Sequence, residues 1–272
     1  MSKYFLKINM LIVYTVDAFT NKPFKGNPAG VCIVEEFPEA ELMQNIAMEL
    51  GYSNTAFVKM KREQEYEIKW FTVKSEAPLC GHATIGSMHI LFKEGMIAKN
   101  KEITFNSASG SITASVGDDD WYTLNFPSYP VSPVVLTDEL REVVNIDPIY
   151  TGFAQNCYFM EFESKDALLA LEPKLELLKK IDCRALIATS KGTDFDFHSR
   201  YFAPAVGIDE DPVCASAHCR LIPYWSNKLS KEALRAYQLS RRGGELRCKN
   251  LGNRVLISGE AVTVMKGFLN IA

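Results

Sequence analysis

Two cysteines in matching pentapeptides are the residues of this sequence best suited to chemistry. The first pentapeptide is Cys80-Gly-His-Ala-Thr and the second is Cys214-Ala-Ser-Ala-His. Each consists of a cysteine, a small residue, a polar residue, alanine and another polar residue, and each opens a predicted helix. The cysteines are 134 positions apart, close to half of the 272 residues. A similar order of strand, turn and helix surrounds each of them, which predicts an internal duplication.

A helix N-terminus would give these cysteines surroundings suited to acid/base chemistry. Unpaired backbone N–H groups and a partial positive charge stabilise anions there. The pKa of a thiol at such a position is expected to fall toward neutrality, because the thiolate is favoured. A substrate carboxylate could bind the same N–H groups. Gly81 and Ala215, each next to its cysteine, would let a ligand approach the backbone closely.

Two such turns facing one another would place a substrate carbon between two sulfur atoms. One thiolate would remove a proton from one side of the carbon, and the opposite thiol would return a proton to the other side. The N–H donors would stabilise the enolate-like charge that develops. This is cofactor-independent racemisation or epimerisation of a small carboxylate substrate, with Cys80 and Cys214 as the acid/base pair in a cleft between the two halves.

Three plainer interpretations stay open at this point. Both cysteines could be inert core thiols. The cysteines and histidines could bind a metal, but their spacing matches no common zinc pattern, so no metal site is predicted. A nucleophilic dyad of Cys80 and His82 is a third alternative. Residues two apart on a turn are expected to point in different directions, which argues against this dyad.

Two further segments carry polar residues that could serve the site. Residues 26–30, Gly-Asn-Pro-Ala-Gly, form a turn by composition, in which Asn27 either shapes the turn or contacts substrate. Residues 209–212, Asp-Glu-Asp-Pro, come directly before Cys214. They are either a solvated acidic loop or a helix N-cap with a general acid/base residue nearby, for which Asp211 is the candidate.

Composition argues against several other classes of protein. The net charge of −3 provides no basic surface, so neither nucleic acid nor an anionic membrane is an expected partner. No apolar stretch approaches the roughly 20 residues of a membrane helix. Asp17 closes the first apolar run, which is too short for a signal peptide. The seven cysteines show no disulfide spacing, so they are expected to be free thiols in a cytoplasmic protein.

The pattern of apolar residues predicts a mixed α/β protein of two similar halves, residues 1–128 and 129–272, with the last strand able to pair back with the first half. A proline-rich segment, 126–133, is the expected linker. Alternating or continuous apolar runs predict strands at 11–16, 31–34, 66–70, 102–106, 111–116, 122–126, 157–162, 185–189 and 195–202. Helices are expected at 39–50, 83–94, 138–144, 165–171 and 216–229.

Nearly the whole chain resembles the phenazine-biosynthesis PhzF-like family of the diaminopimelate-epimerase-like superfamily. The segments that carry this resemblance include residues 16–20, 26–28, 46–57, 70–72, 78–84, 210–218 and 223–225. The resemblance implies two similar domains, each a mostly antiparallel barrel-like sheet around a central helix, with the site between them. It also implies an enzyme without a cofactor. Homodimers are common among members, so a homodimer is one expectation.

Three positions depart from the family pattern. The catalytic Glu of the phenazine isomerases is replaced here by Asn54, and an amide cannot shuttle a proton at neutral pH. Position 214 is Cys where Thr is usual, and position 215 is Ala where Gly is usual. The pair of Cys80 and Cys214 is instead similar to the catalytic cysteines of diaminopimelate epimerase and proline racemase.

The sequence therefore predicts a two-cysteine isomerase. Cys80 and Cys214 would be the acid/base pair, with His82 and Asp211 as further catalytic residues. The expected substrate-binding residues are Asn27, Asn54, Gly81, Ala215 and Ser216. One alternative is a PhzF-type isomerase that shifts a proton with His82 and Asp211. Another is a catalytically inactive family member that binds a ligand or a protein.

Overall fold

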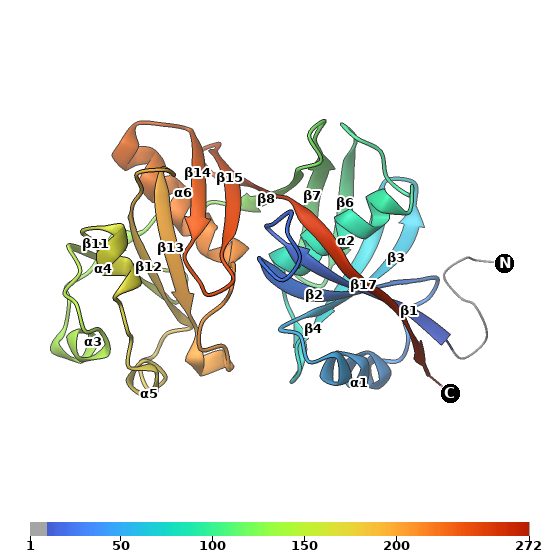
Figure 1. Ribbon diagram of the computed structural model, residues 1–272, viewed down its shortest axis with the longest axis horizontal. Coiled ribbons are helices and arrows are strands. Elements are labelled where there is room, and N and C mark those ends of the chain that lie inside the picture. Colours follow the sequence, from blue (N-terminus) through green and yellow to red (C-terminus); the bar gives the residue numbers. More distant parts are fainter. Residues whose placement is uncertain (1–9, 272) are drawn as a thin grey trace. The chain divides into compact units, whose positions relative to one another are not determined.

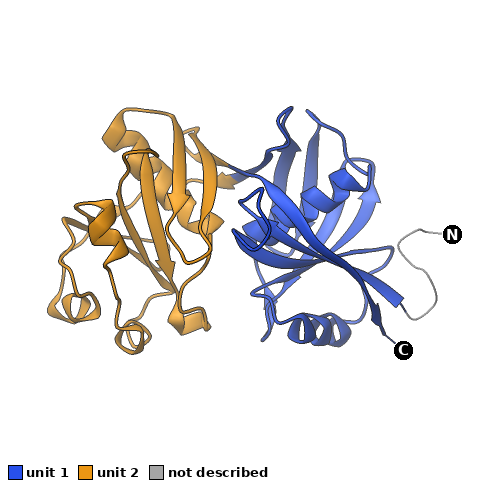
Figure 2. Cartoon of the chain, viewed as in Figure 1, with its two compact units in different colours: residues 1–125, 258–272 blue, residues 126–257 orange. Residues whose placement is uncertain are grey.

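A computed structural model describes residues 10–271, and the chain divides into two compact units (Figure 1; Figure 2). Unit 1 ends at Asn125 and resumes at Ser258, whereas unit 2 runs from Phe126 to Ile257. The first boundary lies at the start of the proline-rich segment. The last strand belongs to unit 1, so unit 1 is assembled from both ends of the chain.

Unit 1 is a mostly antiparallel sheet with two helices. Its strands are β1 (Met10–Ala18), β2 (Asn27–Val34), β3 (Thr55–Arg62), β4 (Glu65–Phe71), β5 (Glu76–Ala77), β6 (Glu102–Ser107), β7 (Gly110–Val116), most of β8 (Tyr122–Pro127) and β17 (Ala261–Asn270). The helices are α1 (Ala40–Leu50) and α2 (Gly81–Lys93). Strands β2 and β3 are parallel, as are β4 and β6, and a helix connects each parallel pair. The first strand, β1, pairs with both β2 and β17.

Unit 2 repeats this order of elements. Its strands are β9 (Ser132–Pro133), β10 (Tyr150–Ala154), β11 (Cys157–Phe162), β12 (Ala185–Lys191), β13 (Phe197–Phe202), β14 (Ala233–Gln238), β15 (Gly244–Asn250) and most of β16 (Arg254–Gly259). Its helices are α3 (Asp138–Val143), α4 (Lys165–Leu169), α5 (Leu175–Leu178), α6 (Ala215–Leu229) and the short 3-10 helix η1 (Pro204–Val206). From β10 to β15 the pairings are antiparallel, parallel, antiparallel, parallel and antiparallel. The same sequence of pairings runs from β1 to β7 in unit 1, and this shared topology supports the duplication.

Each unit has one helix that is buried on nearly every side. All residues from 82 to 91 of α2 are buried, and α2 contacts β1, β2, β3 and β17. Helix α6 is buried in the same manner and contacts β14 and β15. A helix that is buried all round lies inside its domain rather than on its surface. No helix within residues 10–271 is both long and apolar enough to cross a membrane.

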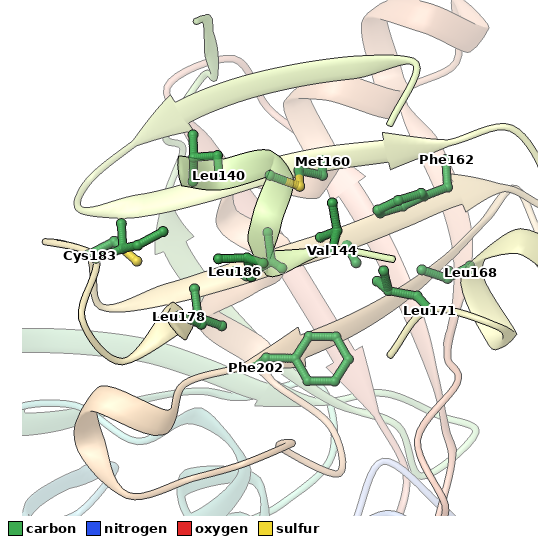
Figure 3. Packing of buried hydrophobic residues seen from close by; sticks show 13 residues of the cluster. Leu140, Val144, Met160, Phe162, Leu168, Leu171, Leu178, Cys183, Leu186 and Phe202 are labelled. Atoms are coloured by element: carbon green, nitrogen blue, oxygen red, sulfur yellow. The ribbon is translucent and has the colours of Figure 1, made fainter. Parts of the chain in front are cut away.

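The face of each sheet that points away from its buried helix carries a second apolar cluster. In unit 1, Met43 and Ile46 of α1 pack against Leu11, Val13 and Phe57 of the sheet. In unit 2, the short helices α3, α4 and α5 cover β11, β12 and β13, and Figure 3 shows residues such as Leu140, Met160, Leu168 and Phe202 converging there. The strands between the two layers are therefore buried on both faces, which explains their continuous apolar runs.

Local sequence accounts for how several helices begin and end. Gly51 is left-handed at the end of α1, and its N–H donates to the Ala47 carbonyl. Helix α2 begins two residues before the expected position because Cys80 is its N-cap. Pro223 lies inside α6 and has no N–H for the Cys219 carbonyl. The backbone N–H of Tyr129, in the proline-rich segment, donates to that carbonyl at 2.8 Å instead.

Candidate active site

In unit 1 the turn at Cys80 joins β5 to the buried helix α2. Cys80 has extended backbone angles at the N-cap position, and its side chain is only 6% exposed. The Thr84 hydroxyl donates a hydrogen bond to the Cys80 carbonyl at 2.6 Å. Gly81 is the first residue of the helix. The sulfur is thus held at the N-terminus of α2, as the sequence predicted.

His82 lies at the centre of a small polar cluster. Its Nδ1 is 3.5 Å from the Cys80 sulfur and 3.3 Å from Nδ2 of Asn27, and its Nε2 is 3.2 Å from the Ser53 hydroxyl. Because Nδ2 of Asn27 can only donate, Nδ1 of His82 carries the lone pair and Nε2 carries the proton. Burial lowers the pKa of His82 to about 4. The ring is therefore neutral at physiological pH and can accept a proton at Nδ1.

This contact corrects one expectation from the sequence. The side chains of Cys80 and His82 were expected to point in different directions, and that expectation is wrong. The first turn of α2 brings the ring back over the cysteine at the N-cap, since the N-cap residue itself is extended. Cys80 and His82 therefore form a local pair.

Asn27 and Asn54 come from strands next to the Cys80 turn. Asn27 begins β2, is fully buried and contacts His82. Asn54 comes directly before β3, and its carbonyl accepts a hydrogen bond from the Gly30 N–H. Its side chain is 8% exposed, and its Oδ1 has no hydrogen-bond partner among the described residues. An unsatisfied buried oxygen of this kind is a suitable acceptor for a donor on a ligand.

In unit 2 the turn at Cys214 is built in the same way. Cys214 is the extended N-cap of α6 and is 7% exposed. The hydroxyl of Ser216 is 3.3 Å from the Cys214 sulfur, and Nδ1 of His218 is 2.9 Å from the Cys214 carbonyl. A carbonyl can only accept, so Nδ1 of His218 carries the proton. Ser216 therefore corresponds to His82, and His218 corresponds to Thr84.

The pKa of the Cys214 thiol corrects a second expectation. It was expected to fall toward neutrality at the helix N-terminus, but it is raised well above its usual range. Burial is the largest cause, and the negative charge of Asp211 adds to it. The hydrogen bonds from Ser216 and from the Ala217 N–H lower it only in part. Desolvation outweighs the helix terminus here, so Cys214 is a thiol at neutral pH.

Gln238, at the end of β14, connects two of the predicted site residues and was missed from the sequence. Its Oε1 accepts a hydrogen bond from the Cys214 N–H at 2.9 Å, and its Nε2 donates to the Asp211 carbonyl at 2.6 Å. The side chain is fully buried. A single glutamine 24 positions beyond Cys214 gives no signal in the sequence. Gln238 reaches the Cys214 turn only because β14 pairs with β13.

Replacement of Gln238 by leucine should loosen the Cys214 turn. It leaves a buried N–H and a buried carbonyl without partners, which costs about 1–3 kcal/mol for each group. We therefore expect a loss of at least about 2 kcal/mol in the free energy of unfolding. Alkylation of Cys214 by iodoacetamide, followed by peptide mass spectrometry, should become faster, while alkylation of Cys80 should not change.

The matched control is Gln44→Leu, which removes one similar side-chain bond, to the Thr72 carbonyl in unit 1. It should leave the alkylation of Cys214 unchanged. Gln238→Leu protein that is destabilised but shows unaltered Cys214 alkylation would contradict a positioning role for Gln238.

Asp211 and its acidic neighbours have separate roles. Asp211 accepts a hydrogen bond from the Val213 N–H at 3.3 Å, and its own N–H donates to the Tyr201 carbonyl. Glu210 instead pairs with Arg200 at 2.8 Å. The N-cap of α6 is Cys214, so neither acidic residue caps the helix by its side chain.

The structure therefore assembles the predicted residues in two groups. Cys80, Gly81, His82 and Asn27 adjoin one another in unit 1, with Asn54 next to Ser53. Asp211, Cys214, Ala215 and Ser216 adjoin one another in unit 2. That both sulfurs act on one carbon stays a prediction. Across residues 10–271, no three His, Cys, Asp or Glu side chains are grouped so as to hold a metal ion.

The sequence matches the family described as "Phenazine biosynthesis-like protein" over residues 16–267. It is 45% identical over 260 residues to an uncharacterised isomerase of Halalkalibacterium halodurans, covering 94% of this chain and 97% of that protein. It is 37% identical to a phenazine biosynthesis protein of the PhzF family from Enterococcus faecalis. That crystal structure superposes with a TM-score of 0.90, covering 95% of this chain and 98% of the other.

A more distant structure extends the likeness of fold. A hydroxyproline epimerase from Agrobacterium vitis is 11% identical and superposes with a TM-score of 0.63, covering 96% of this chain and 93% of that one. At this identity the likeness concerns the fold alone. Together with the close structural relative, it confirms the epimerase-like fold class predicted from the sequence.

Proposed function

The chain belongs to the phenazine biosynthesis-like family, and from that premise we propose that it is a cofactor-independent isomerase acting on a small carboxylate substrate. The name of the Halalkalibacterium relative supports an isomerase in general terms. The finer proposal is that Cys80 and Cys214 move a proton as an acid/base pair. It would make the reaction a racemisation or epimerisation.

The observation that carries this proposal is the matching construction of the two turns. In each unit a cysteine is the N-cap of the buried helix, a polar side chain two residues later contacts its sulfur, and one four residues later binds its carbonyl. An inert core thiol needs none of these partners. Racemisation runs in both directions between mirror-image configurations. Two similar acid/base groups suit such a reaction, because each acts as the base in one direction and as the acid in the other.

The proposed reaction begins with Cys214 as a thiol and Cys80 as the base. Cys80 removes the proton next to the substrate carboxylate, and the electron pair moves into the carboxylate. The N–H groups at the starts of α2 and α6 stabilise the enediolate that forms. The Cys214 thiol then gives its proton to the opposite side of the carbon. The neutral ring of His82 can accept a hydrogen bond from the Cys80 thiol at Nδ1, so it orients the sulfur before the thiol loses its proton.

Substrate binding in this proposal uses the polar residues around each turn. Gly81, Ala215 and Ser216 offer backbone N–H groups, and Asn27 orients His82. Asn54 stands where the phenazine isomerases carry their catalytic Glu. Its unpartnered Oδ1 supports a role as a hydrogen-bond acceptor for substrate rather than as a base.

Deuterium incorporation tests this function across many candidate substrates at once. A panel of amino acids and 2-hydroxy acids is incubated with the protein in deuterium oxide. We expect at least one compound to gain deuterium at the carbon next to its carboxylate, with inversion of configuration, because the proton removed exchanges with solvent. Proton NMR follows the loss of that signal, and chiral chromatography follows the inversion.

The control in this assay is protein in which both Cys80 and Cys214 are serine. If no compound exchanges and no ligand alters the alkylation of either cysteine, the proposal fails and an inactive family member is favoured. Exchange that survives in the double variant would favour a second candidate, in which His82 and Asp211 shift the proton. The neutral, hydrogen-bonded ring of His82 is the observation in favour of that candidate.

A further inference from the structure

Asn54 lies in the short turn between α1 and β3, and contacts on two sides hold this turn in place. The Asn54 carbonyl accepts a hydrogen bond from the Gly30 N–H of β2 at 3.1 Å. The hydroxyl of the preceding residue, Ser53, is 3.2 Å from Nε2 of His82 in the first turn of α2. The backbone of Asn54 is therefore fixed beside the start of the helix that carries Cys80.

The direction of the Asn54 side chain follows from the strand that it begins. A methyl group added at Gly30 would lie 2.8 Å from the Thr55 hydroxyl and 3.0 Å from Leu50, so Gly30 and Thr55 share the face that α1 covers. Val31, the next residue of β2, packs against α2 on the other face. Neighbouring residues of an extended chain point to opposite faces. The side chain of Asn54 is therefore on the face that α2 covers.

The Oδ1 atom of Asn54 is a buried acceptor that the described residues do not use. Asn54 is 8% exposed, and Oδ1 has no hydrogen-bond partner among residues 10–271. Buried polar atoms in folded proteins nearly always have a partner. Since this atom lies on the α2 face, beside the residue that contacts His82, its donor is expected to come from a ligand at the Cys80 turn.

The surroundings of this acceptor favour an uncharged donor. The amide of Asn54 and the hydroxyl of Ser53 carry no charge, and burial lowers the pKa of His82 to about 4, so its ring is neutral. The N-terminus of α2 carries a partial positive charge, which attracts a carboxylate and repels an ammonium group. An ammonium group next to Asn54 would lose its water without gaining an opposite charge, whereas a hydroxyl group carries no charge to desolvate.

We propose that Oδ1 of Asn54 accepts a hydrogen bond from the hydroxyl group of a 2-hydroxy acid, so that the substrate is a hydroxy acid rather than an amino acid. The inference rests on the proposed function of the Cys80 turn. The substrate carboxylate binds the N–H groups at the start of α2, and the hydroxyl on the neighbouring carbon binds Asn54. These two contacts orient the carbon whose proton moves. Asn54 thus determines specificity and takes no proton itself.

Protection of Cys80 from alkylation tests the inference on the full chain. The probes are three sets of acids, each with one carbon skeleton: propionate, lactate and alanine; hydrocinnamate, phenyllactate and phenylalanine; succinate, malate and aspartate. The chiral acids are used as racemates, and iodoacetamide labelling is measured by peptide mass spectrometry. In at least one set the hydroxy acid should protect Cys80 at a concentration at least about threefold lower than the other two acids, as expected for one added neutral hydrogen bond.

Two substitutions of Asn54 should change this preference in different ways. Asn54→Ala removes the acceptor, so the advantage of the hydroxy acid over the acid without a hydroxyl should fall to less than about twofold. Asn54→Asp keeps an acceptor of the same shape and adds a negative charge. The amino acid of the set should then protect Cys80 at a concentration at least about fivefold lower than the hydroxy acid, because its ammonium group gains a charged partner.

The matched control is Asn45→Asp, because Asn45 is an exposed residue of α1 in the same unit. It adds the same charge away from the Cys80 turn and should leave the preference for the hydroxy acid unchanged. The inference is overturned if no hydroxy acid has the advantage, or if the advantage persists in Asn54→Ala. It is also overturned if Asn54→Asp does not make the amino acid the better ligand.

Failure of this inference can be separated from failure of the proposed function. If a hydroxy acid protects Cys80 through Asn54 but no compound gains deuterium, the binding site stands and the isomerase does not. If amino acids gain deuterium and Asn54→Ala leaves the order of protection unchanged, the isomerase stands and the role of Asn54 does not.

Discussion

Replacement of either Cys80 or Cys214 by serine should slow inversion of the substrate by about 10²–10⁴-fold, the usual contribution of a positioned acid or base. The exchange of sulfur for oxygen changes one atom, so the fold should persist. A serine hydroxyl is far less acidic than a thiol, so at neutral pH it does not ionise and cannot act as the base that the thiolate provides. The measurement is the rate of inversion, together with deuterium uptake, for a compound that the panel identifies.

The two single variants should also differ from each other. Removal of one sulfur leaves the other on its own side of the carbon, so exchange without inversion can survive in one of them. Cys219→Ala is the matched control, because Cys219 is also buried in α6 and burial raises its pKa to about 12. It should change the rate by less than about threefold, well below the contribution of a positioned acid or base. Equal losses in Cys219→Ala and Cys214→Ser would mean that packing, and not proton transfer, explains the effect.

Acid should unfold this protein between about pH 6.5 and 4, above the range in which most carboxylates titrate. All four histidines have a lowered pKa, mainly because of burial, and for His82, His89 and His218 it falls to about 4. The folded state therefore holds them neutral, whereas the unfolded chain binds protons near about pH 6.5. Their contribution to stability is complete above about pH 6.5 and is lost as the pH falls toward about 4.

The size of this effect follows from the number of protons taken up. For each proton bound on unfolding, the free energy of unfolding falls by about 1.4 kcal/mol for every unit that the pH is lowered. Three histidines together give a slope of about 4 kcal/mol per pH unit. His198 adds less, because Asp194 lies 3.3 Å from its ring and favours its charge, while Lys165 opposes it. Urea unfolding from about pH 7.5 to 4.5 measures the slope. Uptake of fewer than about one proton below pH 6 would contradict the buried, neutral histidines.

The sequence was sufficient for features that depend on local pattern. The small and polar residues after Cys80 and Cys214 mark helix starts in any context, and Gly51 is the usual residue at a left-handed helix end. The spacing of the two pentapeptides indicated a duplication because both copies keep the same local turn.

Features that depend on tertiary contacts could not be predicted in this way. The raised pKa of Cys214 comes from burial and from Asp211, and burial is not visible in the sequence. Gln238 reaches Cys214 only because β14 lies beside β13. The contact of Cys80 with His82 depends on the extended N-cap, which turns the sulfur toward the ring.

The pairing of β1 with β17 has a consequence for how the chain folds during synthesis. The pairs run from Met10 with Asn270 to Ala18 with Ala261. Strand β1 therefore cannot complete its pairing until β17 has been synthesised. Unit 2 is continuous and can form as soon as residue 257 has left the ribosome, while unit 1 is still incomplete. Until then the edge of β1 that β17 will cover remains an unprotected template for other chains. Translation therefore completes the second unit before the first, and this edge of β1 needs protection until β17 has been synthesised.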